Sequence, residues 1–130
     1  MVSVVRTFVQ AVCQARQVDG SIVQTVVLAT SEAVSNIVRH AHRDRPERSF
    51  QVQCRVGHDA VEVTLLDQGP PFDLLQVPEL EPGELRIGGR GVYLMRALMD
   101  EVTCETLGEV GNRLRLVKHL ATANQERNCG

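Results

Sequence analysis

Apolar residues recur at helical intervals over the first forty positions of the chain. Between residues 4 and 17 they stand among glutamines and arginines and predict an amphipathic helix: Val4, Val5, Phe8, Val12 and Ala15. Asp19-Gly20 interrupts this pattern, and Ser21 followed by Gln24 has the form of a capping box. A second helix is therefore predicted from Ser21 to about His42, where Arg43-Asp44-Arg45-Pro46 ends it.

The pattern changes to alternation after residue 50. Residues 50–56 and 60–66 place apolar side chains at every second position, and the intervening Gly57-His58-Asp59 predicts an antiparallel hairpin with one buried face. Residues 102–107 and 110–120 predict a second hairpin, after a helix that contains Val92. Residues 67–91 show no clear period, and so long a loop inside a compact domain is usually functional.

The predicted order is helix, helix, two strands, long loop, helix, two strands. Because helices and antiparallel strands are segregated, we expect an α+β two-layer sandwich with the helices on one face of a mostly antiparallel sheet. A single domain over residues 1–120 and a polar tail over residues 121–130 account for the 130 residues.

Composition then narrows the classes of function. The chain is 43% hydrophobic and 23% charged with a formal net charge of -2, which indicates a soluble globular domain and disfavours direct nucleic-acid binding. Aromatic residues make up only 3%, too few for a base-stacking surface. No apolar run reaches the roughly 18 residues of a membrane span and the start does not resemble a signal peptide, so we expect a cytoplasmic protein that binds no membrane. The four scattered cysteines are expected to be free, partly buried thiols rather than zinc ligands.

Three polar clusters carry the candidate chemistry, and the first lies on the second predicted helix. Each step of four residues advances only about 40° around an α-helix, so Glu32, Asn36 and His40 line one edge beside the apolar stripe. The amide oxygen of Asn36 can ligate a hard cation such as Mg²⁺, and the carboxylate of Glu32 can accept a proton or orient a nucleophile. A solvated helix edge is the alternative interpretation.

The second cluster, Asp67-Gln-Gly69-Pro-Pro-Phe72-Asp73, begins where a buried strand runs into the long loop. The carboxylate of Asp67 can accept a hydrogen bond from an exocyclic amine such as that of adenine. Gly69 leaves room for a flat ring beside the backbone. An ordinary strand-terminating turn uses the same residue types and is the alternative here.

The third cluster, Gly88-Gly89-Arg90-Gly91-Val92-Tyr93-Leu94, leads from the loop directly into a helix. Free backbone N–H groups and the positive end of the helix dipole favour an anion at this point, and Arg90 adds positive charge. No Gly-Lys-Ser/Thr follows, so the segment is not a Walker loop. A flexible hinge is the alternative.

In this order the three clusters resemble those of the Bergerat-type ATPases, the superfamily that includes gyrase and the histidine kinases. The short chain and the phrases EAVSNIVRHAH, DQGPPFD and GGRGVYLMRALMDEV are similar to the anti-sigma factor serine kinases of bacteria, over roughly residues 4–120. The resemblance implies a Bergerat ATP-binding fold and a protein-serine kinase that uses ATP and Mg²⁺.

The resemblance also implies roles for individual residues. Glu32 matches the general base of phosphoryl transfer, and Asn36 matches the ligand of the Mg²⁺ that bridges the phosphates. Asp67 matches the carboxylate that binds the adenine amine, with Gly69 beside the ring.

The resemblance also implies which residues contact the phosphates and which form the lid. Gly89 and Gly91 match the glycines on the phosphates, and residues 70–88 match a mobile lid over ATP. The remaining motif residues expected at the nucleotide are His40, Phe72, Arg90 and Val92.

The implied substrate is a serine on a small anti-anti-sigma protein of the STAS fold. A sigma factor or another regulatory target is the second implied partner, a PP2C-type phosphatase reverses the modification, and the kinase forms a homodimer. Two features differ from the family. Only about three residues precede the first predicted helix, where the family has a further strand, which affects its usual dimer contacts. Gly111-Asn112-Arg113 stands where Gly-Thr is common, which weakens the nucleotide prediction.

Three other functions stay open on the sequence. The main one is a non-catalytic module of the same fold that sequesters a partner with nucleotide optional, although the retained Glu32 favours the enzyme. The catalytic domain of a histidine kinase is disfavoured because residues 1–31 contain no histidine. A gyrase- or MutL-like ATPase would need a further transducer domain.

Overall fold

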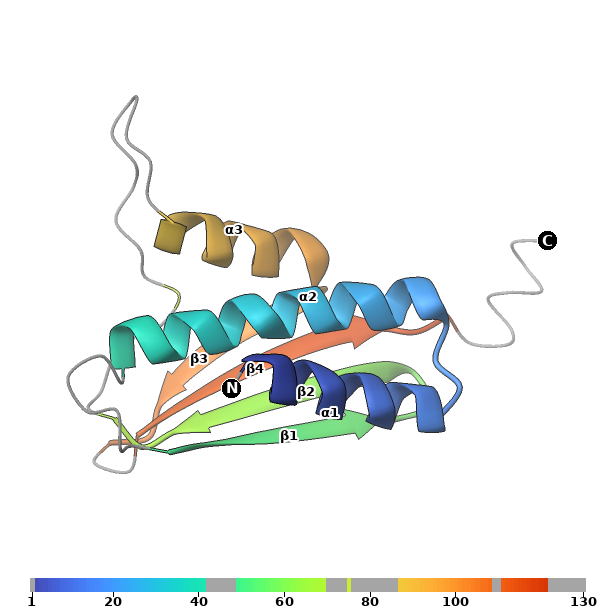
Figure 1. The fold of residues 1–130 in the computed structure, drawn as a ribbon, viewed down its shortest axis with the longest axis horizontal. Coiled ribbons are helices and arrows are strands. Elements are labelled where there is room, and N and C mark those ends of the chain that lie inside the picture. The colour runs from blue at the N-terminus through green and yellow to red at the C-terminus, as the bar shows by residue number, and fades with distance from the viewer. Residues whose placement is uncertain (1, 42–48, 70–74, 76–86, 109–110, 122–130) are drawn as a thin grey trace.

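The computed structural model describes residues 2–41, 49–69, 75, 87–108 and 111–121. In these residues the helices lie over one face of a four-stranded sheet (Figure 1). The elements follow in the order α1 (Val2–Ala15), α2 (Gly20–Asn36), a π-helical segment (Ile37–Ala41), β1 (Phe50–Val56), β2 (Ala60–Asp67), α3 (Ile87–Leu98), β3 (Glu101–Thr106) and β4 (Asn112–His119).

The described strands are arranged in the order β1-β2-β4-β3, and every neighbouring pair is antiparallel. The second hairpin therefore pairs with the first through β4, which lies beside β2 in the middle of the sheet. In this register Asp67, the last residue of β2, stands opposite Asn112, the first residue of β4. The predicted α+β sandwich with helices on one face of an antiparallel sheet is confirmed.

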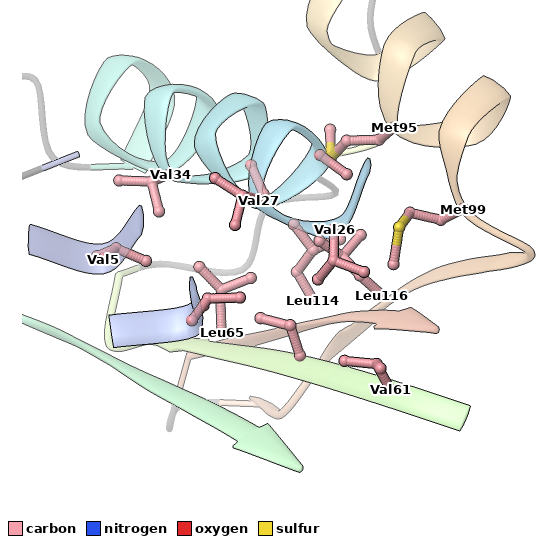
Figure 2. Packing of buried hydrophobic residues seen from close by; sticks show 14 of the residues in the cluster. Val5, Val26, Val27, Val34, Val61, Leu65, Met95, Met99, Leu114 and Leu116 are labelled. Carbon is pink, nitrogen blue, oxygen red and sulfur yellow. The ribbon is translucent and has the colours of Figure 1, made fainter. Parts of the chain in front are cut away.

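The core lies between the sheet and α2. Alternation along β2 turns Val61, Val63 and Leu65 inward, and all three are fully buried. Figure 2 shows Val26, Val27 and Val34 of α2 pointing toward the sheet side chains. Met95 of α3 and Met99, which follows the end of α3, close one side of the cluster. Because α2 carries its apolar stripe into this layer, the stripe also fixes the direction in which its neighbouring polar edge points.

The buried face of α1 differs from the predicted one. The residues buried on α1 are Val5, Val9 and Cys13, whereas Val4 is 70% and Phe8 is 42% exposed. The apolar positions of this segment cover more of the helix circumference than the layer beneath can bury. A narrow stripe of every fourth residue therefore packs inward.

The predicted start and end of the second helix need correction. Ser21 is not the N-cap, because α2 begins at Gly20 after Asp19 and the Ser21 hydroxyl donates to Asp19 Oδ2 at 2.7 Å. The α-helix also does not continue to His42, since Ile37–Ala41 is π-helical and residues 42–48 lie outside the described part. Bonding from residue i to i+5 widens the turn, so α-helical spacing does not apply beyond Asn36.

The same helix bears on the membrane prediction. Residues Gly20–Arg39 form a stretch long and apolar enough, by length and composition, to cross a bilayer, contrary to the expectation from the sequence. Half of that stretch is buried inside the domain, which is what the central helix of a folded core requires.

Two predicted segments fall mainly outside the described residues. Of the predicted lid over residues 70–88, the structure describes Leu75, which packs against the core, and the start of α3. Of the predicted tail over residues 121–130, it describes Ala121 alone.

Candidate functional site

The three clusters identified in the sequence meet at one end of the fold. Figure 1 shows the C-terminal end of α2, the end of β2 and the start of α3 at the same end of the molecule. α2 packs against α3 on one side and against the sheet below. Residues that are distant in the sequence are therefore brought to a common region by the packing of three elements.

Glu32, Asn36 and Gly91 form the closest part of this region. Glu32 and Asn36 are one turn apart on α2, and Gly91 of α3 faces both of them. A Cβ added at Gly91 would stand 3.1 Å from Glu32 Oε2 and 3.2 Å from Asn36 Oδ1. The glycine thus leaves room where a carboxylate and an amide converge, and a side chain there would fill the space.

The amide of Asn36 is buried without a hydrogen-bond partner among the described residues. Asn36 is fully buried, and neither its Oδ1 nor its Nδ2 makes a hydrogen bond to any residue in the described part of the chain. A buried polar group without a partner costs about 1–3 kcal/mol, so native structures seldom keep one without a function. An amide oxygen beside a carboxylate is the donor set that a hard cation such as Mg²⁺ prefers, so these residues fit the implied ion.

Asp67 lies at the end of β2, with its side chain 2% exposed. Asn112 of β4, also fully buried, donates from Nδ2 to Asp67 Oδ2 at 3.1 Å. The adjacent Gly111 has φ +128°, and a Cβ there would overlap the Asp67 carbonyl oxygen. Glycine is thus required both by the backbone conformation and by the close approach to Asp67.

Asn112 is the residue whose contribution the sequence did not indicate. The sequence registered it only as a difference from the usual Gly-Thr, whereas its amide directly orients the candidate adenine-binding carboxylate. The signal that reveals it is the pairing of β2 with β4. That pairing depends on long-range register and not on local sequence.

The glycine-rich segment has a different local structure from the one predicted. Helix α3 begins at Ile87, so Gly88, Gly89 and Gly91 lie within its first turns and not in a loop before it. The first four N–H groups of a helix have no intrahelical acceptor, so this turn still presents backbone donors and the positive end of the dipole. Val92 turns into the hydrophobic core.

The other predicted site residues are placed less completely. Gly69 is buried two residues beyond the end of β2. His40 lies in the π-helical segment, so the spacing that put it on one edge with Glu32 and Asn36 does not hold. The side chains of His40 and Arg90, and all of Phe72, lie outside the described residues.

A groove between α1 and α2 extends to the candidate base. Its volume is about 580 Å³, and its lining includes Arg6 and Gln10 from α1 and Leu28, Ser31 and Glu32 from α2. Glu32 therefore borders two spaces, the buried side next to Gly91 and an open groove on the surface. A carboxylate in that position can contact groups that arrive from either side.

Comparisons with known proteins agree with this arrangement. The profile of the histidine kinase-like ATPase domain matches residues 1–118. The chain is 30% identical to the serine-protein kinase RsbW of Oceanobacillus iheyensis over 107 residues, which are 76% of this chain and 66% of that protein. It is 36% identical to RsbW of Bacillus velezensis over 92 residues, 65% of this chain and 58% of the relative. The chain thus spans about three fifths of the length of these curated relatives.

A solved structure also shares the fold. The histidine kinase domain of the blue-light activated histidine kinase from Erythrobacter litoralis EL346 matches with a TM-score of 0.50 at 26% identity, covering 75% of this chain and 47% of that one. The family profile, the relatives and the shared fold lead to one conclusion. The chain belongs to the histidine kinase-like ATPase domain family.

Proposed function

We propose that this protein is a cytoplasmic protein-serine kinase that uses ATP and Mg²⁺ to phosphorylate a STAS-domain anti-anti-sigma protein. The single observation that carries the proposal is the buried amide of Asn36, which has no hydrogen-bond partner among the residues that the structure describes and lies beside Glu32 and Gly91. A domain without a polar ligand gains nothing from that arrangement, since it costs stability. The similarity to proteins named serine-protein kinase supports a protein serine as the acceptor.

Each residue has a distinct task in this proposal. Asp67, oriented by Asn112, accepts a hydrogen bond from the adenine amine, and the first turn of α3 presents N–H groups to the phosphates. Asn36 would hold Mg²⁺, which when bound neutralises charge on the phosphates. Burial of Asn36 and Asp67 keeps water away from these contacts and strengthens them.

Glu32 acts on the acceptor. The groove between α1 and α2 gives a segment of the partner protein a path to its carboxylate. Glu32 then orients the serine hydroxyl toward the phosphate and takes up its proton as general base. Because the groove and the space beside Gly91 both border Glu32, nucleotide and acceptor approach the same carboxylate from different sides.

The regulatory context completes the proposal. A sigma factor or another regulatory target is the second partner, and a PP2C-type phosphatase restores the unphosphorylated STAS protein. The kinase works as a homodimer, and residues 70–88 serve as the lid over ATP. Phosphorylation releases the STAS partner, so nucleotide and partner supply together set which complex forms.

The test compares four forms of the protein: wild type, Glu32→Gln, Asn36→Ala and Glu101→Gln. Glu101 is an exposed carboxylate on the first residue of β3 and controls for loss of a negative charge away from the site. ATP binding is measured by calorimetry with and without Mg²⁺, and transfer is measured with labelled ATP and candidate STAS proteins.

We expect wild type and Glu101→Gln to bind ATP and label a STAS protein. Glu32→Gln should bind ATP but lose most transfer, since one general base contributes about 10²–10⁴-fold. Asn36→Ala should lose the Mg²⁺-dependent part of binding. Absence of ATP binding by wild type would refute the nucleotide site. Binding that persists in Glu32→Gln, with no labelling by any form, would instead establish a partner-sequestering module.

A further inference from the structure

Two cysteines that are far apart in the sequence meet between α1 and β1. Cys13 lies on the inward face of α1 and is fully buried, whereas Cys54 on β1 is half-buried. Both are free thiols. The start of α1 lines a pocket with Phe50 and Val52, and residues 16–18 line another with Val56, so α1 runs alongside β1 and brings Cys13 over Cys54 at the core. Each side chain is also close enough to shift the pKa of the other. The two sulfur atoms are therefore neighbours, held by the packing of a helix on a strand.

This contact makes the two thiols titrate as a pair. A hydrogen bond from Cys54 stabilises the Cys13 thiolate and lowers the pKa of Cys13. The same hydrogen bond, together with burial, raises the pKa of Cys54. Loss of one proton thus leaves a thiolate next to a thiol, which is the state from which a disulfide is made.

We propose that Cys13 and Cys54 are an oxidation site, which hydrogen peroxide converts into a disulfide that joins α1 to β1. A thiolate of the pair attacks one peroxide oxygen and breaks the O–O bond, giving a sulfenic acid and hydroxide, which takes up the proton already released and becomes water. The other sulfur then attacks the sulfenic sulfur, and its proton leaves with the displaced hydroxide as a second water. Two thiols are oxidised by two electrons, and one peroxide is reduced to two waters.

The position of the pair makes the reaction selective. Cys54 is on the outer strand of the described sheet and partly exposed, so peroxide reaches the pair from that side. Cys104 lies on β3, at the edge of the described sheet opposite to β1, and Cys129 lies outside the described residues. Since α1 also lines the groove beside Glu32, the disulfide fixes one wall of that groove.

The chain is well suited to a direct test by peptide mapping. Trypsin places the four cysteines in four separate peptides, residues 7–16, 49–55, 97–113 and 128–130. The purified protein is treated with hydrogen peroxide, free thiols are blocked by alkylation, and the digest is analysed by mass spectrometry without reduction. We expect the predominant linked species to join peptide 7–16 to peptide 49–55, and to disappear after reduction.

Variants separate this pairing from general oxidation. Cys54→Ser and Cys13→Ala should abolish the linked species, whereas Cys104→Ala, the matched control, should retain it. Oxidised wild type should unfold at a higher urea concentration than the reduced form, and Cys54→Ser should show no such shift. The proposal is overturned if the main link involves peptide 97–113, or if Cys54 ends as a sulfinic acid with Cys13 still reduced. The map of the wild-type protein decides between these results even where a variant fails to fold.

Discussion

Replacing Gly91 by alanine separates the needs of the fold from those of the site. In a helix interior, alanine is more stable than glycine by about 0.5–1 kcal/mol because the unfolded glycine has more conformational freedom to lose. Gly91 lies within α3 and its φ is not in the left-handed region, so the backbone accepts alanine. On helix propensity alone, Gly91→Ala should therefore raise the free energy of unfolding.

The added methyl group works against that gain. It would stand 3.1 Å from Glu32 Oε2 and 3.2 Å from Asn36 Oδ1, so a neighbour must move by a few tenths of an ångström. Glu32 is half-buried and can swing aside, but Asn36 is fully buried on α2 and can yield only if α3 retreats. We expect the two effects to offset, leaving the free energy of unfolding within about 1 kcal/mol of wild type.

Nucleotide binding should respond much more strongly. The methyl group occupies the space in front of the Asn36 amide oxygen, so the contact proposed for Asn36 is lost or lengthened. A hydrogen bond to a charged group contributes about 1.5–3 kcal/mol, which corresponds to a roughly 10- to 150-fold weaker affinity for ATP with Mg²⁺. The variant should therefore be folded and close to wild type in stability, yet defective in binding.

Urea unfolding followed by far-ultraviolet circular dichroism and calorimetry of ATP with Mg²⁺ measure the two quantities. Gly20→Ala is the matched control, because a Cβ at Gly20 in the first turn of α2 meets nothing within 4 Å. The control should keep wild-type affinity. Wild-type affinity in Gly91→Ala would refute the role of this space in binding. A loss of stability above about 2 kcal/mol would show that the glycine serves packing instead.

Three further predictions concern the sheet. Asn112→Asp places a second carboxylate against buried Asp67 and should lower the free energy of unfolding by about 1–3 kcal/mol at pH 7. Part of this loss should be recovered near pH 4, where one carboxylate can be protonated. An unchanged urea midpoint would show that the hydrogen bond between Asn112 and Asp67 is unimportant for stability. Arg115 lowers the pKa of Glu62 below its unfolded value of 4.5, so the pair stabilises the fold above that value and the contribution is lost as the pH falls through the folded pKa. The side chains of Glu62 and Arg115 are 32% and 38% exposed, so a double-mutant cycle should give a coupling energy of about 0.2–1 kcal/mol at pH 7 and none at pH 2. An equal coupling energy at both pH values would show that the interaction is not an ion pair. Leu65→Ala should cost about 2–5 kcal/mol by chemical denaturation, and a cost below 1 kcal/mol would be inconsistent with its full burial.

The parts of the fold with a simple local period were predicted well from the sequence. β1 spans the predicted residues, and β2 exceeds its prediction by one residue, because alternation and a Gly-containing turn leave one register that buries the apolar face. The start of α3 was predicted wrongly for an equally physical reason. Local propensity penalises glycine in helices, but Gly91 is accommodated where α3 passes close to Glu32 and Asn36.

The contacts of the candidate site were likewise predicted only where a local sequence pattern determines them. The alignment of Glu32 with Asn36 follows from helical spacing alone, whereas the π-helical segment that separates His40 from that edge has no local signal. The contact of Asn112 with Asp67 follows from the pairing of β2 with β4 across a long sequence separation. The catalytic and binding roles of these residues stay predictions until the variants are measured.

Helix α2 carries both core side chains and candidate site residues, and this arrangement has a consequence for genetics. Val34 of α2 and Ile37, the first residue of the π-helical segment, are fully buried in the core and lie on either side of Asn36 in the sequence. A substitution that enlarges or truncates either side chain tilts the helix edge that holds Asn36, without contacting any ligand. Screens for loss of regulation should therefore recover temperature-sensitive alleles at these two apolar positions as well as tight null alleles at Glu32 and Asn36. A second-site suppressor that restores core volume should rescue the first group and leave the second unchanged.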